Sequence, residues 1–235
     1  MQPTIIDNYQ SLQQQLQDAC AQAEHGQTVR LLAVSKTKPI SDIQALYQAG
    51  QREFGENYVQ ELVTKATALR HLDLCWHFIG ALQSNKTKLV AAHAHWLLSL
   101  DNLKIMRRLN QQRPKQMPPL QVCLQINIDA EPQKAGIAAT ELLSFADEVA
   151  RQPQLQLRGI MALPNPALDV RRSFERMHQM FQQLQIHYPQ CDTLSIGMSR
   201  DLQAAIACGS TLVRIGTALF GERSQPPPKP PLEGA

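Results

Sequence analysis

Lys36 stands where an apolar run ends, in the stretch "LLAVSKTKP" that covers residues 31–39. Near the other end of the chain, "VRIGTALFG" places Gly216 and Thr217 where a second apolar run gives way to a helical pattern. A lysine amine attacks carbonyl carbons when it is held neutral. Glycine lets a backbone approach an anion closely, and the amides at a helix start favour phosphate. These residue types are typical of a site for a phosphorylated compound that carries a carbonyl group.

Each half of that interpretation has a plainer alternative. A lysine at a strand end usually reaches solvent along its alkyl stem, so Lys36 becomes reactive only if it faces the interior, where burial favours the neutral amine. Lys38 would point the same way if the strand continued, and its charge would favour the neutral amine further. The glycines of the second stretch serve equally well as turn residues. Ser199, at the end of another predicted strand, could add a hydroxyl beside that of Thr217.

If both stretches belong to one site, its ligand combines a phosphate with an aldehyde. Pyridoxal 5′-phosphate is the common cofactor with that chemistry, and a lysine is the residue that holds it. We therefore expect pyridoxal 5′-phosphate as the cofactor if the fold brings residues 36 and 216 together.

The rest of the chain, which must position these residues, alternates short apolar runs with longer amphipathic ones. Such alternation is typical of a parallel sheet with helical crossovers. Eight repeats favour an α/β fold closed into a (β/α)₈ TIM barrel over a doubly wound open sheet, and the first strand–helix turn lacks the GxGxxG fingerprint. The predicted strands cover residues 29–35, 53–57, 74–80, 95–100, 122–128, 157–163, 193–198 and 212–216.

The pattern divides the chain into three parts. Residues 1–26 are predicted to form an amphipathic helix that packs on the barrel. Residues 27–223 form the barrel as a single domain, in which capping side chains predict helix starts at Ser41, Asp101 and Thr140. Residues 224–235, "SQPPPKPPLEGA", are rich in proline and are predicted to be a disordered extension. Functional groups of such a barrel gather at the carboxyl ends of its strands.

Composition excludes several classes of function. A net charge of +3, with no long basic block, does not suggest a nucleic-acid surface. The five cysteines are scattered without CxxC spacing, which predicts neither a metal site nor a disulfide framework. No apolar run approaches the length of a membrane-spanning helix, and the amino terminus does not look like a signal peptide. We expect a cytoplasmic protein that binds neither nucleic acid nor membrane.

Seven stretches make the interpretation specific. In order along the chain they resemble successive motifs of the pyridoxal phosphate homeostasis protein family, from about residue 29 to residue 221. This resemblance implies a (β/α)₈ barrel similar to the amino-terminal domain of alanine racemase, and a role in the homeostasis of pyridoxal 5′-phosphate. The stretches are "AVSKTKP", "FGENYVQE", "WHFIGALQSNK", "KAGI", "GIMALP", "SIGMSRD" and "VRIGTALFG".

The resemblance also implies roles for single residues. Lys36 matches the lysine that holds the cofactor as a Schiff base. Ser199 matches a serine that binds the phosphate, and Gly216 and Thr217 match the backbone amides around it.

Two further matches concern the cofactor ring. Arg214 matches the arginine that faces the pyridine nitrogen, and Asn57 matches an asparagine on the ring side of the pocket. An arginine cannot accept a proton, so the ring nitrogen is expected to stay largely unprotonated and carbanion chemistry to be weak.

Two functional classes remain open on the sequence. Alanine racemase uses a tyrosine from a second domain, and little sequence follows "VRIGTALFG" to supply one. The chain's own tyrosines fall in or beside predicted helices: Tyr9, Tyr47, Tyr58 and Tyr188. We therefore expect no catalytic residues and a monomeric carrier that buffers pyridoxal 5′-phosphate or delivers it to apoenzymes. The alternative is a pyridoxal-phosphate enzyme acting on amino acids, with weak racemase-like activity.

Three other residues have weaker claims. His77, between two aromatic residues on a predicted strand, is expected to line the barrel rather than to act as a general base. Lys65 and Lys134 could contact the aldehyde, but we expect both to be solvated.

Overall fold

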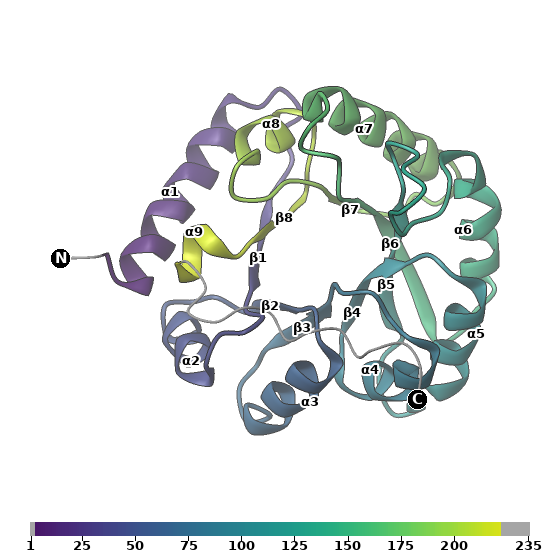
Figure 1. Ribbon diagram of the computed structural model, residues 1–235, viewed down its shortest axis with the longest axis horizontal. Helices are drawn as coiled ribbons and strands as arrows, with labels where there is room; N and C mark the ends of the chain where they lie inside the picture. Colours follow the sequence, from purple (N-terminus) through teal and green to yellow (C-terminus); the bar gives the residue numbers. More distant parts are fainter. Residues whose placement is uncertain (1–2, 222–235) are drawn as a thin grey trace.

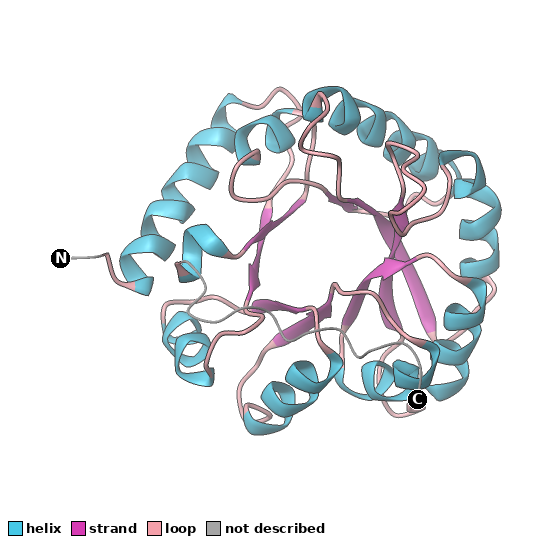
Figure 2. Ribbon diagram, viewed as in Figure 1, coloured by secondary structure: helices cyan, strands magenta, loops and turns pink. Residues whose placement is uncertain are grey.

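The computed structural model describes residues 3–221 and shows a single ring of parallel strands enclosed by helices (Figures 1 and 2). Neighbouring strands pair in the order β7-β6-β5-β4-β3-β2-β1-β8. This arrangement confirms the predicted (β/α)₈ barrel, and every predicted strand is present with ends that differ by at most a few residues. The strands are β1 (Arg30–Val34), β2 (Glu53–Glu56), β3 (Cys75–Phe78), β4 (Trp96–Leu100), β5 (Leu120–Ile126), β6 (Leu155–Ala162), β7 (Thr193–Ser195) and β8 (Leu212–Ile215).

The ring closes between β7 and β8 by separate hydrogen bonds rather than by a regular ladder. The Thr211 amide donates to the Leu194 carbonyl at 2.9 Å, and the Arg214 amide donates to the Gly197 carbonyl at 3.1 Å. On its other side β8 pairs in regular parallel register with β1, with Ala33 opposite Ile215. The carboxyl ends of the first and last strands therefore lie next to each other.

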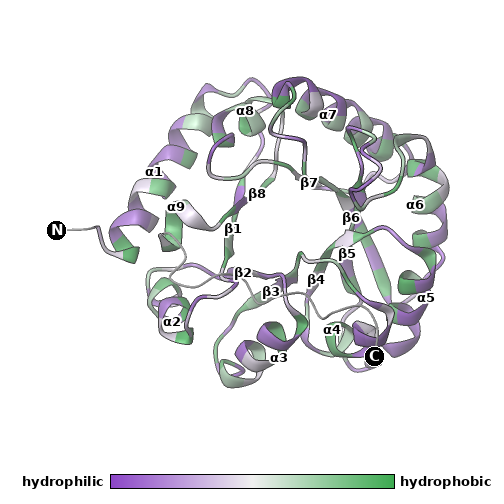
Figure 3. Cartoon of the chain, viewed as in Figure 1, coloured by the Kyte–Doolittle hydropathy of each residue, from purple (hydrophilic) through white to green (hydrophobic). Residues whose placement is uncertain are grey.

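The helices bury one apolar face against the outside of the barrel and present polar residues outward (Figure 3). Within residues 3–221, no helix is long and apolar enough to cross a membrane. The helices are α1 (Ile5–Gln22), α2 (Ile40–Gln48), α3 (Val59–Ala68), α4 (Thr87–His93), α5 (Leu103–Gln112), α6 (Leu142–Ala150), α7 (Val170–His187), α8 (Leu202–Ala207) and α9 (Thr217–Phe220), with 3₁₀ turns at Ser84–Lys86 and Ala139–Glu141.

Helix α1 covers the flank of the barrel beside α2, α8 and α9 (Figure 1). It begins at Thr4, whose hydroxyl accepts the Asp7 amide while the Asp7 carboxylate accepts the Thr4 amide, a capping box. Tyr9, Leu12 and Leu16 are its buried residues. The predicted extension at residues 224–235 lies outside the described residues.

The predicted helix starts need correction. Helix α2 begins at Ile40, so Ser41 lies inside it and Pro39 is the N-cap residue. The φ of −69° at Pro39 is the value that the proline ring imposes. The cap of α5 is Asn102, whose side chain accepts the Lys104 amide at 2.9 Å, and not Asp101. Thr140 lies in the 3₁₀ turn that precedes α6.

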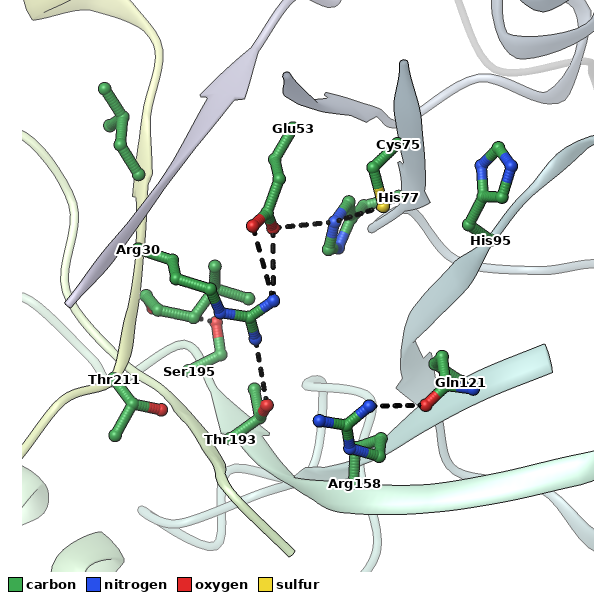
Figure 4. A network of polar contacts seen from close by, with 12 residues as sticks. Arg30, Glu53, Cys75, His77, His95, Gln121, Arg158, Thr193, Ser195 and Thr211 are labelled. Carbon is green, nitrogen blue, oxygen red and sulfur yellow. Dashed lines mark hydrogen bonds and ion pairs between the residues drawn. The ribbon is translucent and has the colours of Figure 1, made fainter. Parts of the chain in front are cut away.

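A polar network fills the barrel at the amino-terminal ends of the strands (Figure 4). The Arg30 guanidinium contacts the Glu53 carboxylate at 3.3 Å and the Thr193 hydroxyl at 3.0 Å. His77 Nε2 lies 3.0 Å from the same carboxylate, and its ring stacks on Trp96 at 5.2 Å. This end of the barrel is therefore packed with partnered charges and rings.

His77 is fully buried, as expected for a residue that lines the barrel. Burial disfavours the imidazolium and lowers the pKa of His77 below its usual value, despite the neighbouring Glu53 carboxylate. The unfolded chain therefore binds a proton at this residue at a higher pH than the folded protein does, so its contribution to the free energy of unfolding falls as the pH drops below about 6.5.

We predict that the difference in unfolding free energy between wild type and His77→Gln shrinks as the pH falls from 8 to 5, by at most about 1.4 kcal/mol per pH unit. Urea unfolding of both proteins across this range measures the difference, and the comparison cancels the titrating groups that do not interact with His77. Glu53 is the exception, because His77 helps to lower the pKa of its carboxyl. A difference that does not change with pH would contradict the buried neutral histidine.

Candidate functional site

Lys36 lies in a tight turn that begins as soon as β1 ends. The Lys38 amide donates to the Ser35 carbonyl at 3.1 Å, and Thr37 adopts a left-handed conformation with φ 62°. Because the strand stops at Val34, the alternation of side chains along a strand does not apply to Lys38. Its ammonium group instead donates to the carbonyls of Phe220 at 3.0 Å and of Gly221 at 3.2 Å, at the end of α9. The expectation that Lys38 points the same way as Lys36 is therefore not supported.

The end of β8 and the single turn of α9 lie against this turn. Gly216 precedes α9, and its carbonyl accepts the Leu219 amide at 3.0 Å. Thr217 is exposed, and the exposed Ser199 joins it from the loop after β7, where its hydroxyl accepts the Ala218 amide at 3.4 Å. Two hydroxyl groups thus lie beside the first amides of α9. The helical turn itself offers these amides no acceptor.

Nothing in the fold requires glycine at position 216. Its φ of −113° suits any residue, and a β-carbon there would meet Val34 at the ordinary distance of 3.5 Å. At Gly159, by contrast, φ is +154° and a β-carbon would lie 1.7 Å from the Thr193 carbonyl oxygen. Where the fold itself does not require glycine, close approach of a ligand to the backbone is another reason for it.

Arg214 is buried inside the barrel beneath this point. Its Nη1 donates to the Ser195 carbonyl at 2.8 Å and to the Ser195 hydroxyl at 2.6 Å, and its Nη2 donates to the Ala162 carbonyl at 2.8 Å. Burial lowers the pKa of Arg214 to about 10, so the guanidinium stays protonated at neutral pH. It links the ends of β6, β7 and β8 and, with five N–H donors, retains the capacity to donate further.

Asn57 follows β2, the neighbour of β1 on the side away from β8. Its Oδ1 is buried and makes no hydrogen bond within the described residues, which is costly unless a ligand or water completes it. Asn57 also lines a cavity of about 470 Å³ at the carboxyl ends of the strands, together with Ser99, Asp101 and Lys134. Burial raises the pKa of the Asp101 carboxyl, although the Gly136 amide donates to it.

The structure therefore gathers most of the predicted site residues on one arc of the barrel mouth. Gly216 and Thr217 lie beside the end of β1 that carries Lys36, with Ser199 next to them and Arg214 below. Asn57 belongs to the adjacent cavity, on the next strand.

The two lysines with weaker claims behave differently from each other. Lys134 is partly exposed, pairs with Glu131 at 2.6 Å and lines the cavity beside Asn57. Lys65 was expected to be solvated, and that expectation is wrong, because its side chain is only 7% exposed. Residue spacing offered one signal: Glu61 and Lys65 are four apart on a helix, a spacing that brings opposite charges together.

Lys65 is the centre of a network that sequence reasoning missed, which we call the Lys65 network. Its ammonium group contacts the Ser35 carbonyl at 2.8 Å, Glu56 Oε1 at 2.9 Å and Glu61 Oε2 at 2.7 Å. The Ser35 hydroxyl also donates to Glu56 Oε1, at 2.6 Å. Burial raises the pKa of Glu56 to about 7, and the Lys65 ammonium opposes the rise.

Comparison with known proteins agrees with this geometry. The family model described as "Alanine racemase, N-terminal domain" matches residues 8–224. The pyridoxal phosphate homeostasis protein of Pasteurella multocida is 52% identical over 228 residues, covering 94% of this chain and 98% of that protein. The protein of the same name from Escherichia coli K12 is 54% identical over 201 residues, covering 83% of this chain and 86% of that protein.

Solved structures give the same picture. PipY from Synechococcus elongatus, solved with PLP bound, superposes with a TM-score of 0.80 at 34% identity and covers 93% of this chain and all of that one. Alanine racemase from Corynebacterium glutamicum superposes with a TM-score of 0.71 at 15% identity, over 96% of this chain but only 62% of that one; this likeness shows the fold alone. The chain belongs to the family of pyridoxal phosphate homeostasis proteins.

Proposed function

We propose that this protein binds pyridoxal 5′-phosphate through Lys36 and buffers it or passes it on, without efficient catalysis. The observation that carries the proposal is the adjacency of the Lys36 turn to Gly216 and Thr217, across the pairing of β1 with β8. The PLP-bound structure of the relative PipY and the names of the bacterial relatives support it.

The residues present fit this cofactor. The hydroxyls of Ser199 and Thr217 and the first amides of α9 suit a phosphate. The orphaned Oδ1 of Asn57 offers an acceptor on the neighbouring side. When bound, the cofactor supplies an aldehyde carbon that condenses with an amine and releases water. Lys36 supplies that amine.

Arg214 limits the chemistry of such a site. With a pKa of about 10 it is a donor at neutral pH, so it can donate to an unprotonated ring nitrogen but cannot take up the proton of a protonated one. A carboxylate at this position would favour the protonated ring, which withdraws electrons strongly. The guanidinium therefore suits a protein that holds the cofactor better than one that uses it for catalysis.

We extend the proposal to the oligomeric state, localisation and partners of the protein. We propose a monomer in the cytoplasm that supplies apoenzymes with pyridoxal 5′-phosphate. The cysteines Cys20, Cys75, Cys123, Cys191 and Cys208 are unpaired in the described structure, which fits a reducing compartment.

The first prediction from the proposed function concerns the residue to which the cofactor is attached. After incubation with pyridoxal 5′-phosphate and reduction with borohydride, which turns the new carbon–nitrogen double bond into a stable amine, peptide mapping should place the pyridoxyl group on Lys36. An adduct mainly on Lys38, Lys65 or Lys134 would contradict the assignment.

A second prediction concerns the phosphate. Ser199→Ala should weaken binding of pyridoxal 5′-phosphate by roughly tenfold or more, because a hydrogen bond to a charged group contributes about 1.5–3 kcal/mol. Binding of pyridoxal, which lacks the phosphate, should not change. Fluorescence titration with both compounds measures the two affinities, and equal weakening of both would show that Ser199 does not contact the phosphate.

A third prediction separates a carrier from an enzyme. Incubation of the cofactor-loaded protein with L-alanine and other amino acids should form no more opposite enantiomer or keto acid than free pyridoxal 5′-phosphate does, as followed by chiral chromatography. Rapid turnover would support the alternative of a racemase-like enzyme.

A further inference from the structure

Lys36 lies between two peptide groups that are both held by charged side chains of α3. On one side, the Ser35 carbonyl accepts a hydrogen bond from the Lys65 ammonium at 2.8 Å. On the other side, the Thr37 amide donates to Glu61 Oε2 at 2.7 Å. Because the donor or acceptor is charged in both cases, these bonds are stronger than ordinary backbone hydrogen bonds.

Lys65 holds the other three residues of the Lys65 network together. The ammonium group has three N–H donors, and the Ser35 carbonyl, Glu56 and Glu61 accept one each. Glu56 is the last residue of β2 and is fully buried. The network therefore ties the turn after β1 to the end of β2 and to the first two turns of α3.

The Lys65 network also stabilises an unusual backbone conformation at Thr37. Within residues 3–221, Thr37 and Ala130 are the non-glycine residues with positive φ, and a β-branched residue is rarely found there. Such a conformation is unfavourable unless the surroundings enforce it. The bond from the Thr37 amide to Glu61 does so, directly after the residue proposed to carry the cofactor.

We propose that the Lys65 network is a positioning device for Lys36: it fixes the peptide groups on both sides of this residue and thereby the direction from which its amine reaches the cofactor. The inference rests on the proposed function. Glu56, Glu61 and Lys65 act through the backbone and are positioning residues, not catalytic ones. A turn without these anchors would relax away from the left-handed conformation and would present the amine in many directions.

The test compares substitutions that keep or remove the hydrogen-bond acceptor at position 61. Glu61→Gln retains an oxygen that accepts from both Thr37 and Lys65, whereas Glu61→Ala does not. At a limiting concentration of pyridoxal 5′-phosphate, the rate at which borohydride fixes the pyridoxyl group on Lys36 should fall about tenfold in Glu61→Ala. Glu61→Gln, which keeps the acceptor oxygen but loses its charge, should lose clearly less than Glu61→Ala.

Thr37→Gly, added to Glu61→Ala, should restore part of the lost rate, because glycine adopts the left-handed conformation without strain. Glu175→Ala is the matched control: Glu175 pairs with Arg171 at the same spacing on a helix, but the two side chains are 54% and 72% exposed. It should leave the rate unchanged. Equal rates in Glu61→Ala and wild type, or equal losses in Glu61→Ala and Glu61→Gln, would overturn the proposal.

A second measurement needs no variant and no cofactor. In the wild-type protein the Thr37 amide should exchange with solvent deuterium much more slowly than amides of an unstructured peptide, although it lies in a loop. Fast exchange would overturn the positioning role even if Glu61→Ala does not fold. The outcomes remain distinct from those of the proposed function, which fails if wild-type Lys36 takes up no pyridoxyl group.

Discussion

The parallel pairing of β1 with β8 is the constraint on which the site depends. It sets Ala33 opposite Ile215, so the two chain segments that follow these strands emerge side by side although they are about 180 residues apart in sequence. Lys36 lies just after the end of β1, and Gly216 lies just after the end of β8. Lys38 strengthens the junction by donating to the carbonyls at the end of α9. A shift of register here would separate the amine from the proposed phosphate position.

The barrel divides its polar residues between two ends with different tasks. At the amino-terminal ends of the strands, the Arg30 guanidinium and His77 Nε2 both contact the Glu53 carboxylate (Figure 4). The guanidinium groups of Arg30 and Arg158 lie over the ring of Trp96. At the carboxyl ends, exposed hydroxyls and the orphaned oxygen of Asn57 remain available. This division matches the rule that the carboxyl end of such barrels carries function and the other end stability.

Much of this arrangement could be predicted from local pattern. The apolar runs predicted all eight strands because each strand is buried, and the strand ends then identified Lys36, Gly216 and Thr217. The roles of Arg214 and Asn57 came from the resemblance to the family. Features that depend on partners distant in sequence were harder to predict. Lys65 looked like a solvated helix residue because its partners come from β2 and from the turn after β1. The direction of Lys38 depended on a left-handed residue, Thr37, that no spacing rule predicts.

We propose one orientation for a bound cofactor: phosphate at the start of α9, ring towards Arg214 and aldehyde carbon at Lys36. A crystal structure of the protein grown with pyridoxal 5′-phosphate tests this most directly. We predict electron density continuous with the Lys36 side chain, with the phosphate against Ser199 and the amides of residues 216 and 217. A cofactor attached to another lysine, or a phosphate bound away from α9, would contradict the account.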